Sequence, residues 1–187
     1  NPTNQPTNIY LPGIFVQDEI AINKQNKVLL GMRYDYNSSH GSIFTPRANY
    51  KITSKNKNNI LRLSLGTGYR VVNVFTEEHA ALTGSREVIV ASNLNPETSY
   101  NGNINFVKKI FSTKSDLYLG IDASLFYTYF NNKIFADYDR NPNQIIYDNL
   151  NGFAVSNGAS INFDLVYKNL SLLLGSTLMD VYSVEEN

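Results

Sequence analysis

The sequence predicts an all-β protein, namely an antiparallel up-and-down meander of about eight strands that forms part of a larger transmembrane β-barrel. Three observations indicate this fold class. Apolar and polar residues alternate along successive segments, short and long connections alternate between these segments, and tyrosines gather at one end of them. Helical spacing is nearly absent, and no uncharged apolar run approaches the roughly 18 residues of a membrane-spanning helix.

The composition excludes several classes of protein. Lys+Arg and Asp+Glu are both 16, so the chain lacks the net positive charge of a nucleic-acid binder, and we expect no nucleic-acid partner. The 13 Tyr and 10 Phe residues provide enough apolar surface to exclude disorder. With no Cys and only two His, the chain has no disulfide framework, thiolate site or histidine cluster. The 26 Asn residues favour a β protein with many turns and one hydrated face.

The first four predicted strands lie in the first 70 residues. Residues 14–22 alternate in polarity, and a second strand covers residues 27–36 after a short turn. The third strand covers residues 47–52, and the fourth, which has the cleanest alternation, covers residues 61–70. The turns between them are rich in Asn, Lys and Ser, as expected for tight connections.

Four further strands follow after a lapse in the pattern. Residues 71–97 are predicted to form a long extracellular loop because alternation stops there. The fifth strand covers residues 99–106 and the sixth residues 117–129, with a short turn between them. Residues 131–148 are predicted to form a second extracellular loop. The last two strands, in residues 160–174, flank a tight Lys-Asn turn.

The polar face of these strands indicates a hydrated interior. Arg33, Arg47, Arg62, Asp122 and Asp164 share this face with several Asn residues. Such side chains cannot all be buried unpaired between two packed sheets, which argues against a β-sandwich. In a large barrel the same face lines a hydrated or plugged lumen. The alternating short and long connections, with the tight turns at one end, are typical of outer-membrane barrels.

The opposite, apolar face is predicted to contact lipid hydrocarbon. A one-residue register slip would expose every arginine to lipid, so the assignment of faces is strongly constrained. The residues predicted to face lipid are Leu61, Leu63, Leu65, Leu119, Ile121, Ile161, Phe163 and Leu165. Those predicted to face the lumen are Arg62, Ser64, Gly120, Asp122, Asn162 and Asp164.

Tyrosines on the apolar face concentrate at the ends of the strands. Those predicted at the long-loop end are Tyr34, Tyr36, Tyr69, Tyr100, Tyr127 and Tyr129. Tyr167 lies at the tight-turn end. An interfacial aromatic girdle accounts for this placement. The general preference of tyrosine for strands is the alternative explanation.

Five segments, in order along the chain, resemble motifs of TonB-dependent outer-membrane receptors. FVQDE at residues 15–19 resembles a barrel strand of these receptors, and GMRYDY at residues 31–36 resembles the Gly-x-Arg-Tyr-Asp strand that follows it. FTPRA at residues 44–48 is similar to the family's Thr-Pro-Arg strand, and GTGYR at residues 66–70 to its Gly-x-Gly-[Phe/Tyr]-Arg strand end. LNPETS at residues 94–99 is similar to its Leu-x-Pro-Glu-x-Ser signal. Together these segments extend the resemblance over nearly the whole chain.

The resemblance implies a 22-stranded barrel closed by an N-terminal plug domain, with a short segment that contacts TonB. Residues 1–187 would then be a partial barrel domain, from the middle to later part of the barrel, without the plug. The implied location is the outer membrane of a Gram-negative bacterium, in contact with outer-membrane lipid. The implied function is TonB-energised uptake of a scarce ligand, such as a ferric siderophore, haem or cobalamin. This is transport and not enzyme catalysis, and the chain contains no G-x-S-x-G or H-E-x-x-H motif.

The candidate functional residues on the polar face are Arg33, Arg47, Arg62 and Arg70. One interpretation is that they face the plug domain and pair with its carboxylates, because guanidinium groups form bidentate bonds at partly buried sites. The other interpretation is that they pair with lumen neighbours such as Glu19 or Asp35. The sequence supports both equally.

The two predicted loops carry the other candidates. In the first loop the polar candidates for ligand contact are Glu77, Glu78, His79 and Arg86. In the second, oxygen-bearing side chains at alternating positions resemble a calcium-binding loop. These side chains are Asp137, Asp139, Asn141 and Asp148. Pro142 stands where such a loop needs Gly, and a solvated turn is the alternative. We expect no other cofactor.

Two other classes of protein are alternatives. The first is a complete eight-stranded outer-membrane barrel of structural or adhesive type, because eight strands are the smallest closed membrane barrel. Its narrow interior must be filled by side chains, which the Arg and Asn residues of the polar face suit poorly. The second is a soluble lipocalin-like carrier, which needs its apolar faces turned inward.

Overall fold

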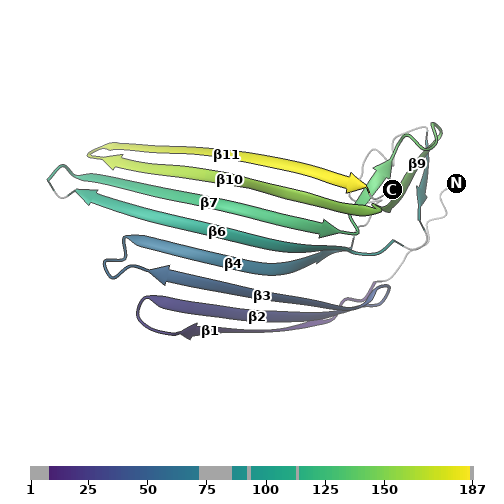
Figure 1. Cartoon of the computed structure of the whole chain (residues 1–187), viewed down its shortest axis with the longest axis horizontal. Coiled ribbons are helices and arrows are strands. Elements are labelled where there is room, and N and C mark those ends of the chain that lie inside the picture. The colour runs from purple at the N-terminus through teal and green to yellow at the C-terminus, as the bar shows by residue number, and fades with distance from the viewer. Residues whose placement is uncertain (1–8, 72–85, 92–93, 113, 186–187) are drawn as a thin grey trace.

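The computed structural model describes residues 9–71, 86–91, 94–112 and 114–185, in which every regular element is a β-strand. Eight long strands form one antiparallel sheet (Figure 1). In the order in which they pair, they are β1 (Gly13–Ala21), β2 (Asn26–Asn37), β3 (Gly41–Thr53), β4 (Asn59–Arg70), β6 (Glu97–Ser112), β7 (Leu117–Asn131), β10 (Gly152–Tyr167) and β11 (Leu170–Glu185). The predicted eight-strand antiparallel meander is confirmed. Within these residues no helix is long and apolar enough to span a bilayer.

Some strands are longer than the sequence pattern indicates. β10 begins at Gly152, whereas alternation becomes clear only from residue 160. Small side chains, including Ala154, Gly158 and Ala159, blur the pattern, but main-chain pairing with β7 continues through them. Strand length is therefore set here by the pairing of neighbours, because the backbone hydrogen bonds need no particular side chain.

Short polar side chains close the tight turns. In the β1–β2 turn, the Asn23 side-chain oxygen accepts hydrogen bonds from the amides of Gln25 and Asn26, at 2.9 Å each. Such Asx turns explain why Asn is frequent in these connections. Lys57 and Lys168 adopt left-handed backbone angles in two other turns, with φ of 60° and 51°.

Successive hairpins are staggered along the sheet. The β3–β4 pairing ends with Thr53 opposite Ile60, and Ile60 pairs on its other side with Val107. The next hairpin continues past that row until Ser112 lies opposite Leu117. Tilted strands in a barrel require a stagger of this kind.

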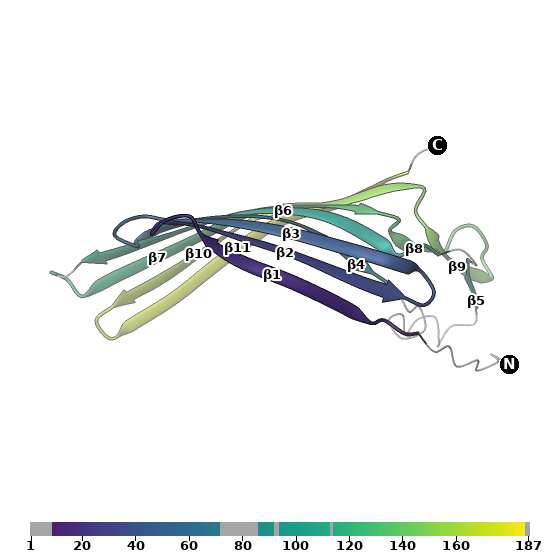
Figure 2. The ribbon, with the colours of Figure 1, turned by 90° about the horizontal axis from the view of Figure 1, so that it is seen from below.

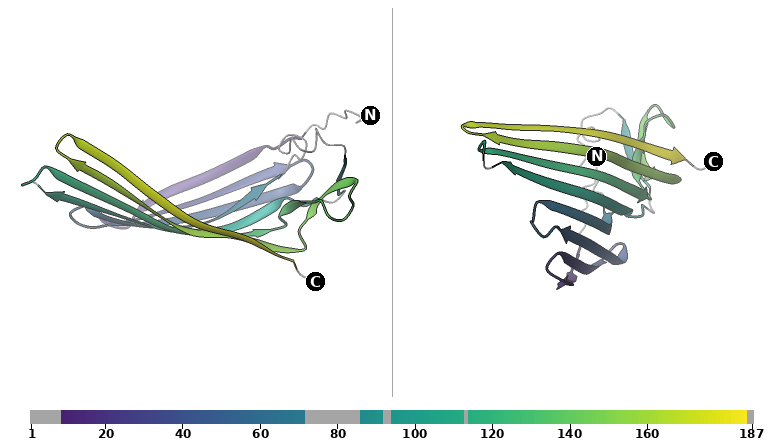
Figure 3. Two further views of the ribbon diagram at one scale, coloured as in Figure 1. Left: turned by 90° about the horizontal axis from the view of Figure 1, so that it is seen from above. Right: turned by 60° about the vertical axis from the view of Figure 1, so that its left-hand side comes forward.

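The eight strands do not close on themselves. β1 and β11 form opposite edges of a curved, twisted sheet (Figures 2 and 3). The alternative of a complete eight-stranded barrel is therefore wrong for these strands, as is a lipocalin-like closed barrel. The sheet has the form of a segment of a wider barrel wall.

The register separates the two faces as predicted. Across the whole sheet, one row of consecutive partners is Ile20, Val28, Tyr50, Leu63, Ile104, Leu125, Ala159 and Leu178. A nearby row on the other face is Lys27, Lys51, Arg62, Asn105, Ser124, Ser160 and Thr177. The apolar face has little protein covering it, and Leu65 is 67% exposed. An uncovered apolar surface of this extent is suited to contact with lipid.

The two predicted loops contain regular structure that the sequence did not predict. β5 (Glu87–Val90), β8 (Ile134–Asp137) and β9 (Gln144–Asn149), labelled in Figure 2, form a second sheet in the order β5-β9-β8, in which β5 is parallel to β9. We call it the loop sheet. Its small core consists of Ile145 and Tyr147, packed against Val88, Ile134 and Ala136.

Candidate functional site

The four arginines of the polar face all bond to acidic or amide side chains of the same sheet. Arg33 of β2 makes a bidentate pair with Asp35, with Nε–Oδ2 and Nη2–Oδ1 distances of 2.7 and 2.8 Å. The Asp35 side chain is completely buried, whereas that of Arg33 is 51% exposed. The predicted pairing of Arg33 with Asp35 is thus present, within one strand and not between strands.

The buried position of Asp35 depends on its neighbours. Gly13 lies directly opposite Asp35 in the register of β1 and β2, and a Cβ atom on Gly13 would lie 1.9 Å from Asp35 Oδ1. The absence of a side chain at Gly13 therefore provides the space for the carboxylate. Tyr69 donates a third hydrogen bond from its hydroxyl to Asp35 Oδ2, at 3.2 Å.

Tyr69 therefore departs from its predicted place in the aromatic girdle. β3 and β4 are paired only from Arg47 with Gly66 onward, so their other ends are not paired with each other. The hydroxyl of Tyr69 bonds to the polar-face carboxylate of Asp35 and does not face the membrane interface. Tyr36, Tyr100 and Tyr127 remain about half exposed, as expected of girdle residues.

Arg47 and Arg62 extend the polar network across the sheet. Arg47 donates from Nη2 to the side-chain oxygen of Gln17, two strands away, and it passes over Gly31, which lies between them in the same row. Arg62 donates to Asn105 Oδ1 at 2.7 Å. Asn105 in turn donates to Asp122 Oδ1 at 2.6 Å and to Ser124 Oγ at 2.9 Å. One chain of polar contacts thus links β4, β6 and β7.

Arg70, the last residue of β4, is part of the connection between the wall and the loop sheet. Its Nε donates to Glu97 Oε2 at 2.7 Å, and the Glu97 side chain is only 8% exposed. The other carboxylate oxygen of Glu97 accepts a hydrogen bond from the main-chain amide of Ile134, the first residue of β8, at 2.8 Å. We call these three residues the Glu97 junction. Asn149 adds a second link, because its amide group bonds the carbonyls of Asn95 and Asn132 at 3.0 and 2.7 Å.

A hollow of about 520 Å³ lies at this junction. Its lining includes Arg70, Glu97, Lys133, Ser99, Ser156 and Met179. It thus combines charged groups and hydroxyls with several apolar side chains, namely Phe130, Ala154, Met179 and Val181, and it lies where the polar wall meets the loop sheet. Such a surface offers both charge and hydrogen-bond donors to a polar ligand or to a protein segment.

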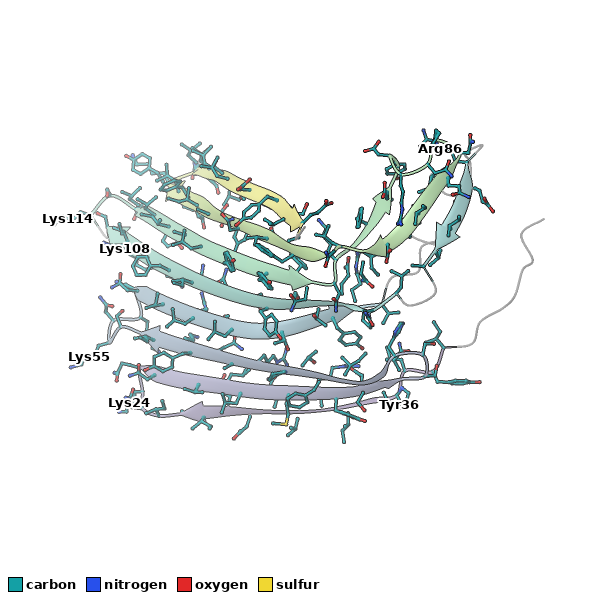
Figure 4. All side chains as sticks on the ribbon, turned by 45° about the vertical axis from the view of Figure 1, so that its right-hand side comes forward. Lys24, Tyr36, Lys55, Arg86, Lys108 and Lys114 are labelled. Atoms are coloured by element: carbon teal, nitrogen blue, oxygen red, sulfur yellow. The ribbon has the colours of Figure 1, made fainter. Side chains whose placement is uncertain are left out.

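The loop candidates are placed only in part. Arg86 adjoins the loop sheet, far from the tight turns (Figure 4), and donates to the carbonyl of Tyr138 at 3.3 Å. Glu77, Glu78 and His79 lie outside the described residues. The structure therefore brings Arg86 together with the second loop and leaves its role in ligand contact as a prediction.

The predicted calcium ligands lie in and beside the turn between β8 and β9. The Asp137 carboxylate accepts hydrogen bonds from the main-chain amides of Asp139 and Arg140, at 3.0 Å each. The side-chain oxygen of Asn141 accepts one from the amide of Asn143, also at 3.0 Å. These oxygens thus shape the turn. Asp148 lies across the strand pair, opposite Phe135. No group of three or more His, Cys, Asp or Glu suited to a metal gathers in the residues that the structure covers. Calcium binding here stays a prediction.

Glu97 and Asn105 are not among the functional residues predicted from the sequence. Glu97 belongs to the LNPETS segment, and the register places it directly opposite Arg70. A carboxylate opposite an arginine on neighbouring strands is a signal that the sequence contains once the strands are aligned. Asn105 gave no such signal, because the strand around it is rich in Asn residues with the same spacing.

Comparison with known proteins agrees with this architecture. Residues 1–184 match the family model of the TonB dependent receptor-like β-barrel. An iron-regulated outer membrane virulence protein of Vibrio cholerae is 28% identical over 122 residues, which is 64% of this chain and 18% of that protein.

Two solved structures show the same fold. The siderophore receptor PirA of Pseudomonas aeruginosa superposes with a TM-score of 0.66 at 17% identity, covering 94% of this chain and 38% of PirA. The ferric enterobactin receptor PfeA of the same species, solved with enterobactin, gives a TM-score of 0.69 at 17% identity, covering 91% of this chain and 27% of PfeA. The chain therefore spans well under half the length of each relative. It belongs to the TonB-dependent receptor family, as a portion of the β-barrel in the outer membrane of a Gram-negative bacterium.

Proposed function

We propose that this chain is part of the wall and the ligand-facing loops of a receptor that takes up a ferric siderophore, with energy supplied through TonB. The relatives support the class of ligand, since one is named as iron-regulated and two are named as siderophore or ferric enterobactin receptors. Haem and cobalamin, which other members of this family carry, are the competing ligands.

The Glu97 junction is the observation that carries this proposal. It fastens the loop sheet to the end of the polar wall through two oxygens of one buried carboxylate. The hollow beside it is lined by Arg70 and Glu97 of the polar face and by Lys133, which directly precedes β8. A ligand held by the loops would therefore lie directly above a hydrated surface with arginines, which suits the passage of an anionic chelate.

The wall arginines also suit contact with a plug domain. Arg33 bonds to a fully buried carboxylate, yet half of its side chain remains exposed on the polar face. An exposed guanidinium edge of this kind can donate hydrogen bonds to a second carboxylate or to a main-chain carbonyl of a domain inside the barrel. We propose that pairing within the wall positions Arg33 and Arg70 for such contacts, so that both interpretations of these arginines apply together.

Uptake in cells that produce the whole receptor containing this chain tests the proposal. The host should lack its own siderophore receptors, and the probes are ferric enterobactin with radiolabelled iron, haem and cyanocobalamin. We expect iron uptake from the siderophore in energised cells, and surface binding without uptake when TonB is deleted. Equal uptake without TonB, or uptake of cobalamin or haem alone, would contradict the proposal.

A matched pair of variants tests the loop sheet. Arg86→Ala removes a cation from the loop sheet, and Lys55→Ala removes one from a tight turn at the other end of the sheet (Figure 4). We expect Arg86→Ala to weaken siderophore binding severalfold, because a cation near the ligand attracts an anionic chelate. Lys55→Ala should bind like the unmodified receptor, and equal loss in both variants would contradict a ligand site at the loop sheet.

A further inference from the structure

Lysine is concentrated at the tight-turn end of the eight-strand sheet. Each of the four tight turns contains lysine and none contains arginine. Of the ten lysines in the sequence, Lys133 alone lies at the loop end. Figure 4 shows Lys24, Lys55, Lys108 and Lys114 along the tight-turn end. The six arginines, by contrast, belong to the polar face or adjoin the loop sheet.

Few acidic groups balance these lysines. In the described part of the four turns the single acidic residue is Asp116. Glu19, at the end of β1, bonds to Lys27 on the polar face, with an Nζ–Oε1 distance of 2.5 Å. The turns themselves therefore present a surplus of positive charge that points away from the sheet.

Lys108 shows how this charge relates to the membrane. It lies on the apolar face, between Phe106 and Ile110 along β6 and opposite Ile121 of β7, and it is exposed. An ammonium group is costly in hydrocarbon, so its stem must lie along the apolar surface while its charge reaches the headgroup region.

The last hairpin marks the same boundary. Lys168 lies over the ring of Tyr167, with its Nζ 5.3 Å from the ring centroid. Tyr167 ends β10 on the apolar face, where an interfacial tyrosine is expected. Lysines of the turns therefore lie at or beyond the level at which the apolar face ends.

We propose that this end of the sheet is a binding surface for anionic phospholipid headgroups in the leaflet that the tight turns reach. We call it the lysine rim, and it consists of Lys24, Lys55, Lys57, Lys108, Lys114 and Lys168. The ammonium group is a compact charge on a flexible stem, which suits phosphates that exchange along a bilayer surface. The short turns of outer-membrane barrels are on the periplasmic side, so the partner is the inner leaflet. The inference rests on the barrel family and not on the identity of the transported ligand.

Spin-labelled lipids provide the test. The whole receptor containing this chain is placed in phosphatidylcholine bilayers, and the immobilised fraction of labelled phosphatidylglycerol is compared with that of labelled phosphatidylcholine. In the rim variant, Lys57 and Lys168 become Asn, which tolerates their left-handed backbone, and the other four lysines become Gln. In the control variant, Lys27, Lys51 and Lys109, which the register places on the polar face at the same end, become Gln.

We expect the unmodified receptor to prefer phosphatidylglycerol severalfold, since one lysine near an anionic lipid surface contributes up to about fivefold. The preference should decline with salt, because the screening length falls to about 3 Å at 1 M. The rim variant should lose the preference for phosphatidylglycerol, and the control variant should keep it. If the rim variant does not insert, the double variant Lys24→Gln and Lys114→Gln repeats the test at smaller amplitude.

Two results would overturn the inference. One is an unchanged lipid preference in the rim variant, which would instead favour an acidic periplasmic partner for the lysines. The other is an equal loss of lipid preference in the control variant, which would mean that the preference does not depend on the position of the lysines. Siderophore uptake is not the readout, so either result leaves the proposed function intact.

Discussion

The two faces of the eight-strand sheet are specified by different kinds of interaction. On the apolar face, the row through Leu63 consists of aliphatic, alanine and tyrosine side chains from one edge to the other. On the polar face, particular side chains form ion pairs, such as Arg33 with Asp35 and Arg70 with Glu97. The stability of the apolar face therefore depends on the medium that covers it. The stability of the polar face depends instead on the geometry of particular side-chain pairs. Substitutions on the two faces should therefore destabilise the receptor for different reasons.

Leu63→Arg should have the largest effect. It places a charge on the apolar face, which costs about 2–4 kcal/mol near the bilayer midplane. Ser64→Arg, one position away on the polar face, should be much milder because water reaches that face. Urea unfolding of the whole receptor in lipid vesicles measures both. Comparable losses for the two variants would reverse the assignment of faces.

Gly13→Ala should come next. The new methyl group would overlap the Asp35 carboxylate and force it away from Arg33 and Tyr69. Overpacking of this kind costs about 1–3 kcal/mol. Gly102→Ala is the control, because its added carbon would meet only Leu65 Cδ2 at 3.4 Å. The same unfolding assay should separate the two, and equal stability would show that Asp35 is not held in place.

Glu97→Gln should have a smaller and more local effect. It keeps an oxygen for the amide of Ile134 but loses the charge that faces the half-exposed Arg70, at a cost of about 1 kcal/mol. Hydrogen exchange at the Ile134 amide should become faster than in the unmodified receptor. Glu87→Gln, on the exposed surface of the loop sheet, should leave that exchange unchanged. Equal exchange in both variants would contradict the Glu97 junction.

Lys27→Gln should have the smallest effect. The Lys27–Glu19 pair is about half exposed on both sides, at 46% and 51%, so solvent screens it. We expect no measurable shift of the urea midpoint. A shift as large as that of Glu97→Gln would mean that exposed pairs of the polar face are as important as buried ones.

Most of the sheet could be predicted from the sequence because alternation is a local signal. Leu61, Leu63 and Leu65 assign β4 to its faces without any knowledge of its neighbours. The bond from Tyr69 to Asp35 could not be predicted, since it depends on where the pairing of β3 with β4 ends. Nor could the partners of Arg62, whose contacts depend on the register of three strands.

The loop sheet was missed for a related reason. Its strands are short, with four residues in β5 and six in β9, so alternation has little length over which to appear. β5 and β9 also pair in parallel across a long stretch of sequence, and no turn motif links these two strands. The loop candidates could be named from residue type alone, but their arrangement required the structure.

The parallel pairing of β5 with β9 also has a consequence for the order in which the protein assembles. Each hairpin of the wall closes a short loop, whereas the bond from Gln144 to Glu87 joins residues 57 positions apart and encloses the whole β6–β7 hairpin. Long loops close at a greater entropic cost, and distant contacts form slowly. We therefore expect the wall to form first and the loop sheet last. The loop sheet would thus be completed only after the β6–β7 hairpin has folded.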